Sequence, residues 1–226
     1  MRQTFDRDLQ RLQDEVLRMG SEVEEHLVTV TNAFLARDAV TSQRLIDADQ
    51  SINERRVQVG LDALTLIAIQ SPMARDMRLI AAILEIVGEL ERIHDYVKGI
   101  GRISLNLGAE PIPPALARDL PEMSEIAREM LYQALKAFAN RDETLARRVP
   151  AMDDRVDLLF NQLYGEIVAL VMADTTQIRR ANQLEWALHN LERSADRTIN
   201  ICEWVVYMAT GVYLEMNMGE YEAPPG

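Results

Sequence analysis

An internal repeat constrains the fold of this chain more than any other feature of its sequence. Two short segments return in recognisable form, one after 104 residues and one after 101: Ala33 to Asp38 (AFLARD) matches Ala137 to Asp142 (AFANRD), and Leu90 to Asp95 (LERIHD) matches Leu191 to Asp196 (LERSAD). Asp49 also meets Asp153 at the first of these offsets. A chain of 226 residues with such a repeat is a tandem duplication, in which each copy forms the same supersecondary unit.

Apolar residues within each copy keep the spacing of α-helices. In the first copy they follow one another in steps of three and four, at Phe5, Leu9, Leu12, Val16, Met19, Val23, Leu27, Val30 and Phe34. The whole chain contains only 8 Pro and 10 Gly, and aromatic residues make up 5% of it. Good helix formers recur throughout. The sequence therefore predicts an all-α protein without strands.

Turn residues divide each copy into three helices. We expect helix breaks near Arg37, near Ser71, across residues 104–114, near Arg141 and near Asp174. Ser71 is expected to be the N-cap of a helix whose first residue is Pro72. In the second copy, one helix is expected to run from Leu145 to Leu170, with Pro150 near its start, where a kink is tolerated.

Six helices joined by short turns predict two antiparallel three-helix bundles related by a pseudo-twofold axis. The first bundle is expected to span residues 1–103 and the second residues 115–211, with residues 104–114 as the linker. The bundles are expected to pack either end to end or side by side. Residues 212–226 lack periodicity and are expected to be disordered.

Composition argues against several classes of partner. The net charge of -12 repels nucleic acid and anionic lipid heads, and it suits cations or basic protein surfaces. The longest apolar-dominated run, residues 63–69, is far shorter than the roughly 20 residues that cross a bilayer. The single cysteine, Cys202, lies among apolar residues and is expected to be a buried thiol. We expect a cytoplasmic protein that is neither secreted nor inserted in a membrane.

Oxygen-bearing side chains recur in pairs four residues apart. Each copy holds two such pairs: Asp49 with Asn53 and Glu91 with Asp95 in the first, Asp153 with Asp157 and Glu192 with Asp196 in the second. On a helix this spacing places both side chains on one face, about 5–6 Å apart at Cβ, where like charges repel unless a cation offsets them. Neighbouring helices would bring four oxygen ligands together, a set that suits Mg, Ca, Mn or Fe better than structural zinc. The alternative is that these pairs are solvated surface residues.

The two predicted sites differ in charge. The second offers four carboxylates, whereas the first offers three and the neutral amide of Asn53. Because fewer charges attract a cation less strongly, we expect the second site to bind metal better. For the same reason Asn53→Asp is expected to strengthen the first site.

The histidines add little evidence for a metal enzyme. Glu91 and His94 have the Glu-x-x-His spacing of di-iron bundle enzymes, but the position of His94 is taken by Ala195 in the second copy. We expect His94 to be a partly buried helix residue, and His26 and His189 to lie on helix surfaces. The chain contains no glycine-rich phosphate loop and no serine or cysteine in an activating motif.

Three motifs resemble those of the PhoU family of phosphate-signalling regulators. They are Gln70 to Arg78 (QSPMARDMR), Leu90 to Asp95 (LERIHD) and Leu191 to Glu203 (LERSADRTINICE). The duplicated three-helix organisation is also that family's pattern, so the resemblance covers nearly the whole chain. It implies a fold of two three-helix bundles.

The resemblance also implies metal clusters, with Fe, Mn, Zn or Mg held by acidic E/D-x-x-x-D motifs. These motifs carry over to Glu91 and Asp95, to Asp153 and Asp157, and to Glu192 and Asp196, with Asn200 one turn beyond. Asp49 carries over as well, but Asn53 stands where the pattern prefers a carboxylate. His94 stands where the motif usually has glycine.

Members of this family limit phosphate uptake and act as negative regulators of the phosphate-starvation response. The resemblance therefore implies two partners, the ATPase subunit of a phosphate ABC transporter and a sensor histidine kinase, together with a regulatory role that needs no catalysis. A homo-oligomer is compatible with it. Two alternatives stay open: a di-iron carboxylate oxidoreductase or metal-dependent phosphohydrolase built on the bundle, and a structural adaptor without metal.

Overall fold

The computed structural model describes residues 2–107 and 110–216. Its six long helices are α1 (Arg2–Ala36), α2 (Ala39–Gln70), α3 (Ala74–Asn106), α4 (Pro114–Asn140), α6 (Asp153–Ala173) and α7 (Ile178–Thr210). Three short helical segments occur in the second half: α5 (Glu143–Ala146), η1 (Val149–Met152) and η2 (Thr175–Gln177). Within the described ranges there is no strand, which confirms the predicted all-α fold.

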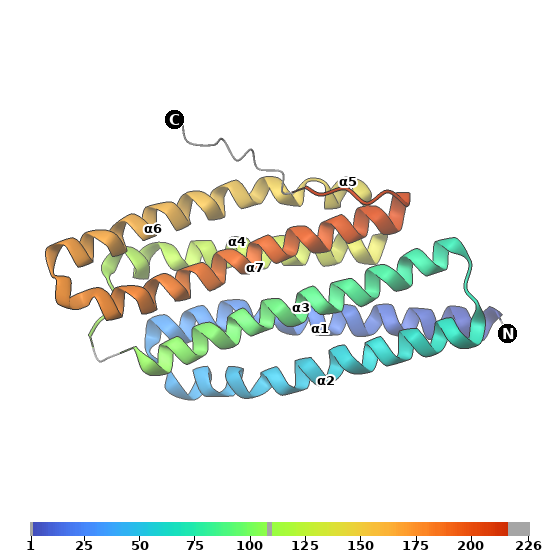
Figure 1. Cartoon of the computed structure of the whole chain (residues 1–226), viewed down its shortest axis with the longest axis horizontal. Helices are drawn as coiled ribbons and strands as arrows, with labels where there is room; N and C mark the ends of the chain where they lie inside the picture. Colours follow the sequence, from blue (N-terminus) through green and yellow to red (C-terminus); the bar gives the residue numbers. More distant parts are fainter. Residues whose placement is uncertain (1, 108–109, 217–226) are drawn as a thin grey trace.

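The helices form two three-helix bundles that lie side by side (Figure 1). The first bundle consists of α1, α2 and α3, and the second of α4, α6 and α7 with the short segments. Helix α3 packs along α7 and α1 along α4, whereas α2 and α6 lie on the outside of the pair. The buried apolar residues of both bundles belong to one cluster. The two bundles therefore share a continuous core.

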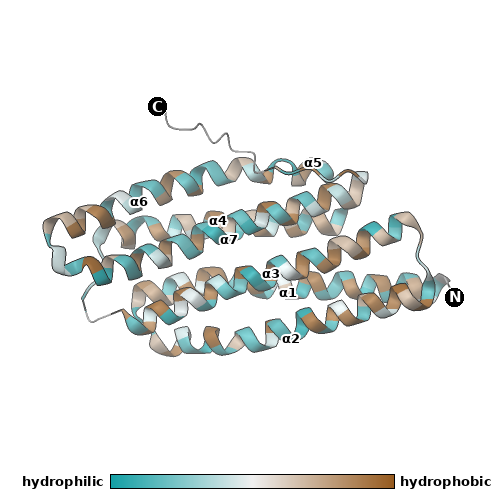
Figure 2. Cartoon of the chain, in the orientation of Figure 1, coloured by the Kyte–Doolittle hydropathy of each residue, from teal (hydrophilic) through white to brown (hydrophobic). Residues whose placement is uncertain are grey.

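Each long helix buries an apolar stripe and exposes a polar one. All nine periodic residues from Phe5 to Phe34 are buried, where α1 packs against α2, α3 and α4. Hydrophobic and hydrophilic residues alternate along the ribbons (Figure 2). Because each Å² of apolar surface removed from water contributes about 25 cal/mol, this stripe is a main source of the stability of the fold.

The repeated Arg-Asp pair forms the same tight turn in both copies. Arg37 and Arg141 adopt left-handed backbone conformations, with φ of 60° and 53°. The carboxylate of Asp38 accepts a hydrogen bond from the backbone N–H of Thr41, and that of Asp142 from Leu145, each at 3.0 Å. These aspartates are N-caps, which satisfy a backbone donor that the first helical turn leaves unpaired. The capping aspartate is the part of the repeat that this turn requires in both copies.

Ser71 does not have its predicted role. It is the C-cap of α2, in a left-handed conformation with φ of 46°, and its N–H donates to the Ile67 carbonyl at 3.2 Å. Helix α3 begins only at Ala74, after Met73, and no side chain caps it. Pro72 follows the C-cap because it cannot continue a helix, so the Ser-Pro pair ends one helix and does not start the next.

The second helix of the second copy is broken, contrary to the prediction of one helix from Leu145 to Leu170. It consists of α5, the 3-10 segment η1, which contains Pro150, and α6. Proline has no N–H to donate and its ring clashes with the carbonyl four residues earlier. The chain nevertheless keeps Ala146 and Val149 buried across the break.

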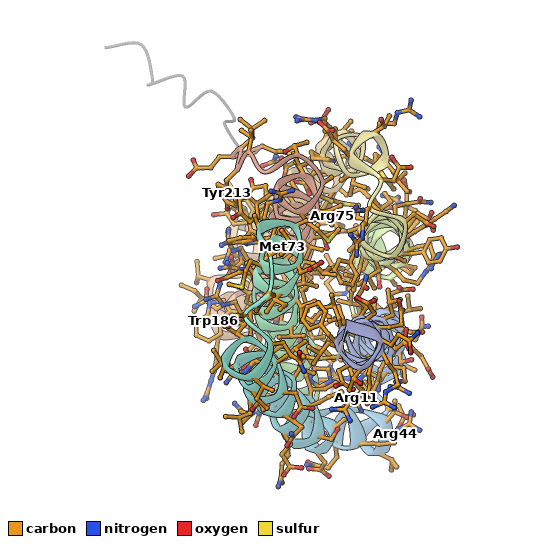
Figure 3. The ribbon with its side chains drawn as sticks, turned by 90° about the vertical axis from the view of Figure 1, so that its right-hand side faces the viewer. Arg11, Arg44, Met73, Arg75, Trp186 and Tyr213 are labelled. Carbon is orange, nitrogen blue, oxygen red and sulfur yellow. The ribbon has the colours of Figure 1, made fainter. Side chains whose placement is uncertain are left out.

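The residues after α7 pack against it. Gly211 ends the helix with φ of 84°, and the hydroxyl of Tyr213 donates to Glu203 Oε2 at 2.9 Å. The ring of Tyr213 lies 5.0 Å from that of Trp204, and the N–H of Met216 donates to Glu203 Oε1 at 2.7 Å. The expected disorder of residues 212–226 therefore does not hold for residues 212–216, and residues 217–226 lie outside the described part of the chain. Tyr213 and Trp186 lie on the same side of the molecule (Figure 3).

Candidate metal centre

The acidic pairs of the second copy face one another across α6 and α7. Asp153 is the first residue of α6, where Pro150 and η1 set the start of the helix, and Asp157 follows one turn later. Glu192 and Asp196 lie one turn apart on α7, which packs against α6. Each of the four carboxylates contributes to the electrostatic repulsion within this group.

Negative charge in this group is poorly compensated. Burial, followed by repulsion from Asp157 and Asp196, raises the pKa of Asp153 to about 7. Burial and repulsion from Asp196 raise the pKa of Glu192 to about 7 as well. Asp153 Oδ1 and Glu192 Oε2 are buried without a hydrogen-bond partner, although the ring of His189 lies 3.3 Å from the latter. A buried polar atom without a partner is costly, so a bound cation would relieve this group.

The carboxylates are not a preformed coordination sphere. As they are placed, the described residues include no group of three or more His, Cys, Asp or Glu side chains that could hold a metal ion. A cation would have to draw the carboxylates together. Among the described residues of this group, Arg193 donates to Asp196 and also acts to lower the pKa of Glu192, whereas no ion pair of Asp153 or Asp157 is found. Unpaired buried oxygens thus favour a cation here, and metal binding itself stays a prediction.

The acidic pairs of the first copy lie in a different environment. The ammonium group of Lys98 lies 2.5 Å from Asp49 Oδ2 and 3.2 Å from Asp95 Oδ1. Asn53 Nδ2 donates to Asp49 Oδ2 at 3.3 Å. Burial acts to raise the pKa of Asp49, but the hydrogen bonds from Lys98 and His94 outweigh it and hold that pKa below its ordinary value. The first site already contains a cation, so these residues do not fit a metal ion as they stand.

Glu91, the fourth member of the first site, has no hydrogen bond among those found in the described residues. Burial and the neighbouring Asp95 raise its pKa, whereas Arg56 acts to lower it. Arg56 is itself partly buried, with Nε unpaired. Sequence reasoning overlooked both Lys98 and Arg56, because nothing in their spacing distinguishes them from ordinary helix residues.

Two histidines join α1 to this first site. His26 Nδ1 lies 2.9 Å from His94 Nε2, and His94 Nδ1 lies 3.3 Å from Asp49 Oδ1. A consistent assignment of protons has His26 donating to His94 and His94 donating to the carboxylate. His94 was predicted to be partly buried, and its side chain is in fact completely buried. The prediction that His26 is a surface residue is wrong, since it is half-buried in contact with His94.

Both imidazoles are expected to stay neutral at pH values where free histidine is half protonated. Burial lowers the pKa of His26 and of His94 from 6.5. Their neutral forms thus stabilise the fold above about pH 6.5, and this contribution is lost as the pH falls below that value. NMR titration of the ring signals should show both midpoints below 6.5 in folded protein. In urea both should return to about 6.5, and a folded midpoint at or above 6.5 would contradict the assignment.

Two further residues lie away from the acidic group of the second copy. Asn200 faces α3 instead, where its amide donates to Glu89 Oε2 at 3.3 Å. The resemblance placed Asn200 one turn beyond Asp196, but the rotation of α7 directs it into the contact between the bundles.

Cys202 is fully buried, which confirms the predicted buried thiol, and burial raises the pKa of that thiol.

The fold and the acidic group define a duplicated helical-bundle protein with a poorly compensated group of carboxylates in its second half. The chain belongs to the PhoU family, since the PhoU domain model matches residues 16–104 and 120–205. The two matches correspond to the two copies of the repeat.

Named relatives extend this assignment. The chain is 30% identical to the phosphate-specific transport system accessory protein PhoU homolog of Rhizobium meliloti (strain 1021), over 92% of this chain and 87% of the relative. It is 30% identical to the homolog of Streptococcus pneumoniae serotype 4, over 96% of this chain and 100% of the relative.

Two crystal structures share the fold. The phosphate transport system regulatory protein PhoU from Streptococcus pneumoniae superposes with a TM-score of 0.87 at 28% identity, over 94% of this chain and 100% of that one. PhoU from Pseudomonas aeruginosa gives a TM-score of 0.86 at 31% identity, over 92% of this chain and 100% of that one.

Proposed function

We propose that this protein is a cytoplasmic negative regulator of the phosphate-starvation response that limits phosphate uptake by binding other proteins. Its partners in this proposal are the ATPase subunit of a phosphate ABC transporter and a sensor histidine kinase. Membership of the PhoU family supports the link to phosphate transport, because the matched relatives are named accessory or regulatory proteins of that system. In this proposal the protein needs no catalytic activity.

An exposed apolar stripe on α6 supports protein binding. Tyr164, Val168 and Met172 are 46%, 39% and 81% exposed, and their spacing of four residues places them on one face of the helix. Phe160 extends the stripe, with its ring stacked 6.2 Å from that of Tyr164. Large apolar side chains that gather on an outer helix mark interaction sites.

The first copy has no stripe at the equivalent positions, although Val57, Leu61 and Leu64 form a different exposed apolar patch on α2. The equivalent positions on α2, at the repeat offset of 104 residues, are Gly60, Leu64 and Ala68. Only Leu64 is a large apolar residue, and it is 57% exposed. The two outer helices of a nearly symmetric molecule therefore present different surfaces.

A protein fits this stripe better than a lipid surface. Residues 143–173 are apolar enough by composition to cross a membrane, and 22% of the qualifying window is buried. However, the helix is interrupted at Pro150, and α6 begins with Asp153 and Asp154. These charges and the net charge of -12 oppose contact with anionic lipids. In this proposal the stripe is the surface that contacts the transporter ATPase subunit.

Genetic complementation tests the proposal. Deletion of the gene should leave phosphate-starvation genes expressed in rich phosphate, because the inhibitory contact is lost. The wild-type gene should restore repression, whereas a Val168→Glu/Met172→Glu double variant should not, because it places two charges in an apolar contact. The same variant should lose co-purification with the ATPase subunit.

Leu64→Glu, at the equivalent position on α2, is the matched control and should restore repression fully. Circular dichroism should show that all variants are folded. If deletion leaves both gene expression and phosphate uptake unchanged, the regulatory proposal is wrong. If the double variant restores repression as well as Leu64→Glu does, α6 is not the docking surface.

A metal ion is the second part of the proposal. The residues that would hold Fe, Mn, Zn or Mg are Asp153, Asp157, Glu192 and Asp196. The unpaired buried oxygens of Asp153 and Glu192 support this assignment. The ion would neutralise charge between α6 and α7 and so hold the helix that bears the apolar stripe. The enzyme alternative has no comparable support, because His94 of the single Glu-x-x-His motif is engaged with His26 and Asp49.

A further inference from the structure

A lysine side chain lies between the acidic pairs of the first bundle, and the equivalent position in the second bundle is apolar. Lys98 reaches from α3 to Asp49 on α2, at 2.5 Å, and to Asp95 on its own helix, at 3.2 Å. Its ammonium thus bridges the two acidic pairs, as a bound cation would. The side chain is only 20% exposed. Its equivalent on α7, at the offset of 101 residues, is the buried Ile199.

Two more basic positions of the first bundle are neutral in the second. Arg56 acts on Glu91 electrostatically, and its equivalent at the offset of 104 is Phe160. His94 contacts Asp49 at 3.3 Å, and its equivalent is Ala195. The duplicated chain therefore has basic groups at three positions around one acidic site and apolar groups at the same three positions around the other.

We infer that Lys98 is a built-in cation of the first bundle, which replaces a metal ion there permanently. An ammonium is a compact charge with three donors, and here it satisfies oxygens from both helices. Because it is tethered to the chain, it stays at the site at any metal concentration. The first bundle then neither binds a metal nor needs one, and metal dependence is confined to the second bundle.

With Lys98 in place, Asn53→Asp is no longer expected to improve metal binding by the first bundle. Charge counting alone predicts that a fourth carboxylate creates a better metal site. However, Asn53 donates to Asp49 Oδ2, the same oxygen that Lys98 contacts. A carboxylate at position 53 would meet the ammonium of Lys98, so it should strengthen the internal ion pair and leave no place for a metal ion.

Manganese binding tests the inference in a protein that lacks the second acidic group. In an Asp153→Asn/Glu192→Gln background, MnCl2 titrated by calorimetry should show no stoichiometric binding. Adding Asn53→Asp should not change this. Adding Lys98→Met should create one manganese site per chain, with affinity at least tenfold above the background, and Lys98→Met with Asn53→Asp should bind more tightly still.

Two controls keep the test decisive if Lys98→Met impairs folding. An Asp49→Asn/Lys98→Met variant removes both charges of the pair and should fold without gaining a manganese site. In the background protein with Lys98 intact, manganese should leave the NMR signals of Asp49 and Asp95 unbroadened. Selective broadening of those signals, or a folded Lys98→Met protein that gains no site, would overturn the inference.

The role inferred for Lys98 rests on the metal site proposed for the second bundle only by comparison. The manganese titrations of the first bundle use a protein in which that second site is removed. If wild-type protein fails to bind manganese, the metal part of the proposed function is wrong. A manganese site created by Lys98→Met would still stand in that case. Failure of wild-type protein to bind manganese therefore counts against the proposed function, whereas failure of folded Lys98→Met to gain a site counts against the role of Lys98.

Discussion

Asp153→Asn is expected to stabilise the metal-free protein at pH 8 by about 2 kcal/mol, since one pKa unit corresponds to about 1.4 kcal/mol. The pKa of Asp153 rises from 3.8 to about 7 on folding, so the folded state favours the neutral acid. Stability from this group is fully present below about pH 3.8 and is lost as the pH rises from there through about 7. The full shift would give about 4 kcal/mol, and we halve it because the group is partly hydrated. Urea unfolding at pH 4 and pH 8 measures the effect, which should be small at pH 4 because most of this carboxyl is then protonated in the folded state and much of it in the unfolded state.

The same substitution should abolish stabilisation by metal. For wild-type protein, MnCl2 at 100 times its dissociation constant should raise the free energy of unfolding by about 2.7 kcal/mol. Asp153→Asn should show little or none of this increase, because it loses a ligand and a charge. Asp154→Asn, at the exposed neighbouring position, is the matched control; because Asp154 contributes the smallest repulsion to Asp153, this variant should show a much smaller change than Asp153→Asn in both experiments. An Asp153→Asn protein that is less stable than wild type at pH 8 would argue against uncompensated charge at this site.

Phe138→Ala is expected to lower the free energy of unfolding by about 3–5 kcal/mol, the usual cost of truncating a buried phenylalanine. Its equivalent in the first copy, Phe34→Ala, should cost a similar amount, since both side chains are fully buried. Tyr132→Ala, on the exposed side of α4, should change stability by less than about 0.5 kcal/mol. Urea denaturation followed by circular dichroism measures all three.

The shape of these transitions tests the shared core. Because apolar residues of both bundles belong to one cluster, each variant should unfold in a single transition that shifts as a whole. If the bundles were independent, Phe34→Ala would shift only the first of two transitions and Phe138→Ala only the second. Two separate transitions would show that the contact of α1 and α3 with α4 and α7 contributes little cooperativity.

Much of the fold follows from local sequence. The spacing of apolar residues in α1 predicts its buried face, and the repeated Arg-Asp pair marks a turn in both copies. These features depend on residues within one or two helical turns of each other. The Ser71-Pro72 pair was misassigned because the same two residue types occur on either side of a helix break. Only the backbone conformation of Ser71 distinguishes the two roles.

The sequence was sufficient to predict which acidic residues form the candidate site. It was not sufficient to predict which basic residues contact them. The spacing of Asp153 with Asp157 and of Glu192 with Asp196 placed each pair on one helix face. Lys98 reaches Asp49 only because of the register between α2 and α3, and His26 meets His94 only because α1 packs beside α3. A single sequence carries no direct information on such registers. The comparison of equivalent positions in the two copies, Lys98 with Ile199, was the available signal.

The contacts of the segment that follows α7 have a consequence for folding during translation. Helices α1, α2 and α3 leave the ribosome first, and domains generally fold in that order during synthesis. Glu203 lies with Glu85 and Glu89 in a pocket between the bundles, and Tyr213 lines it too. The donors that satisfy Glu203 belong to Tyr213 and Met216, which are translated after all six long helices. A nascent chain can therefore build its first bundle early, but it pairs Glu203 at the contact between its two halves only after the segment that follows α7 has been translated.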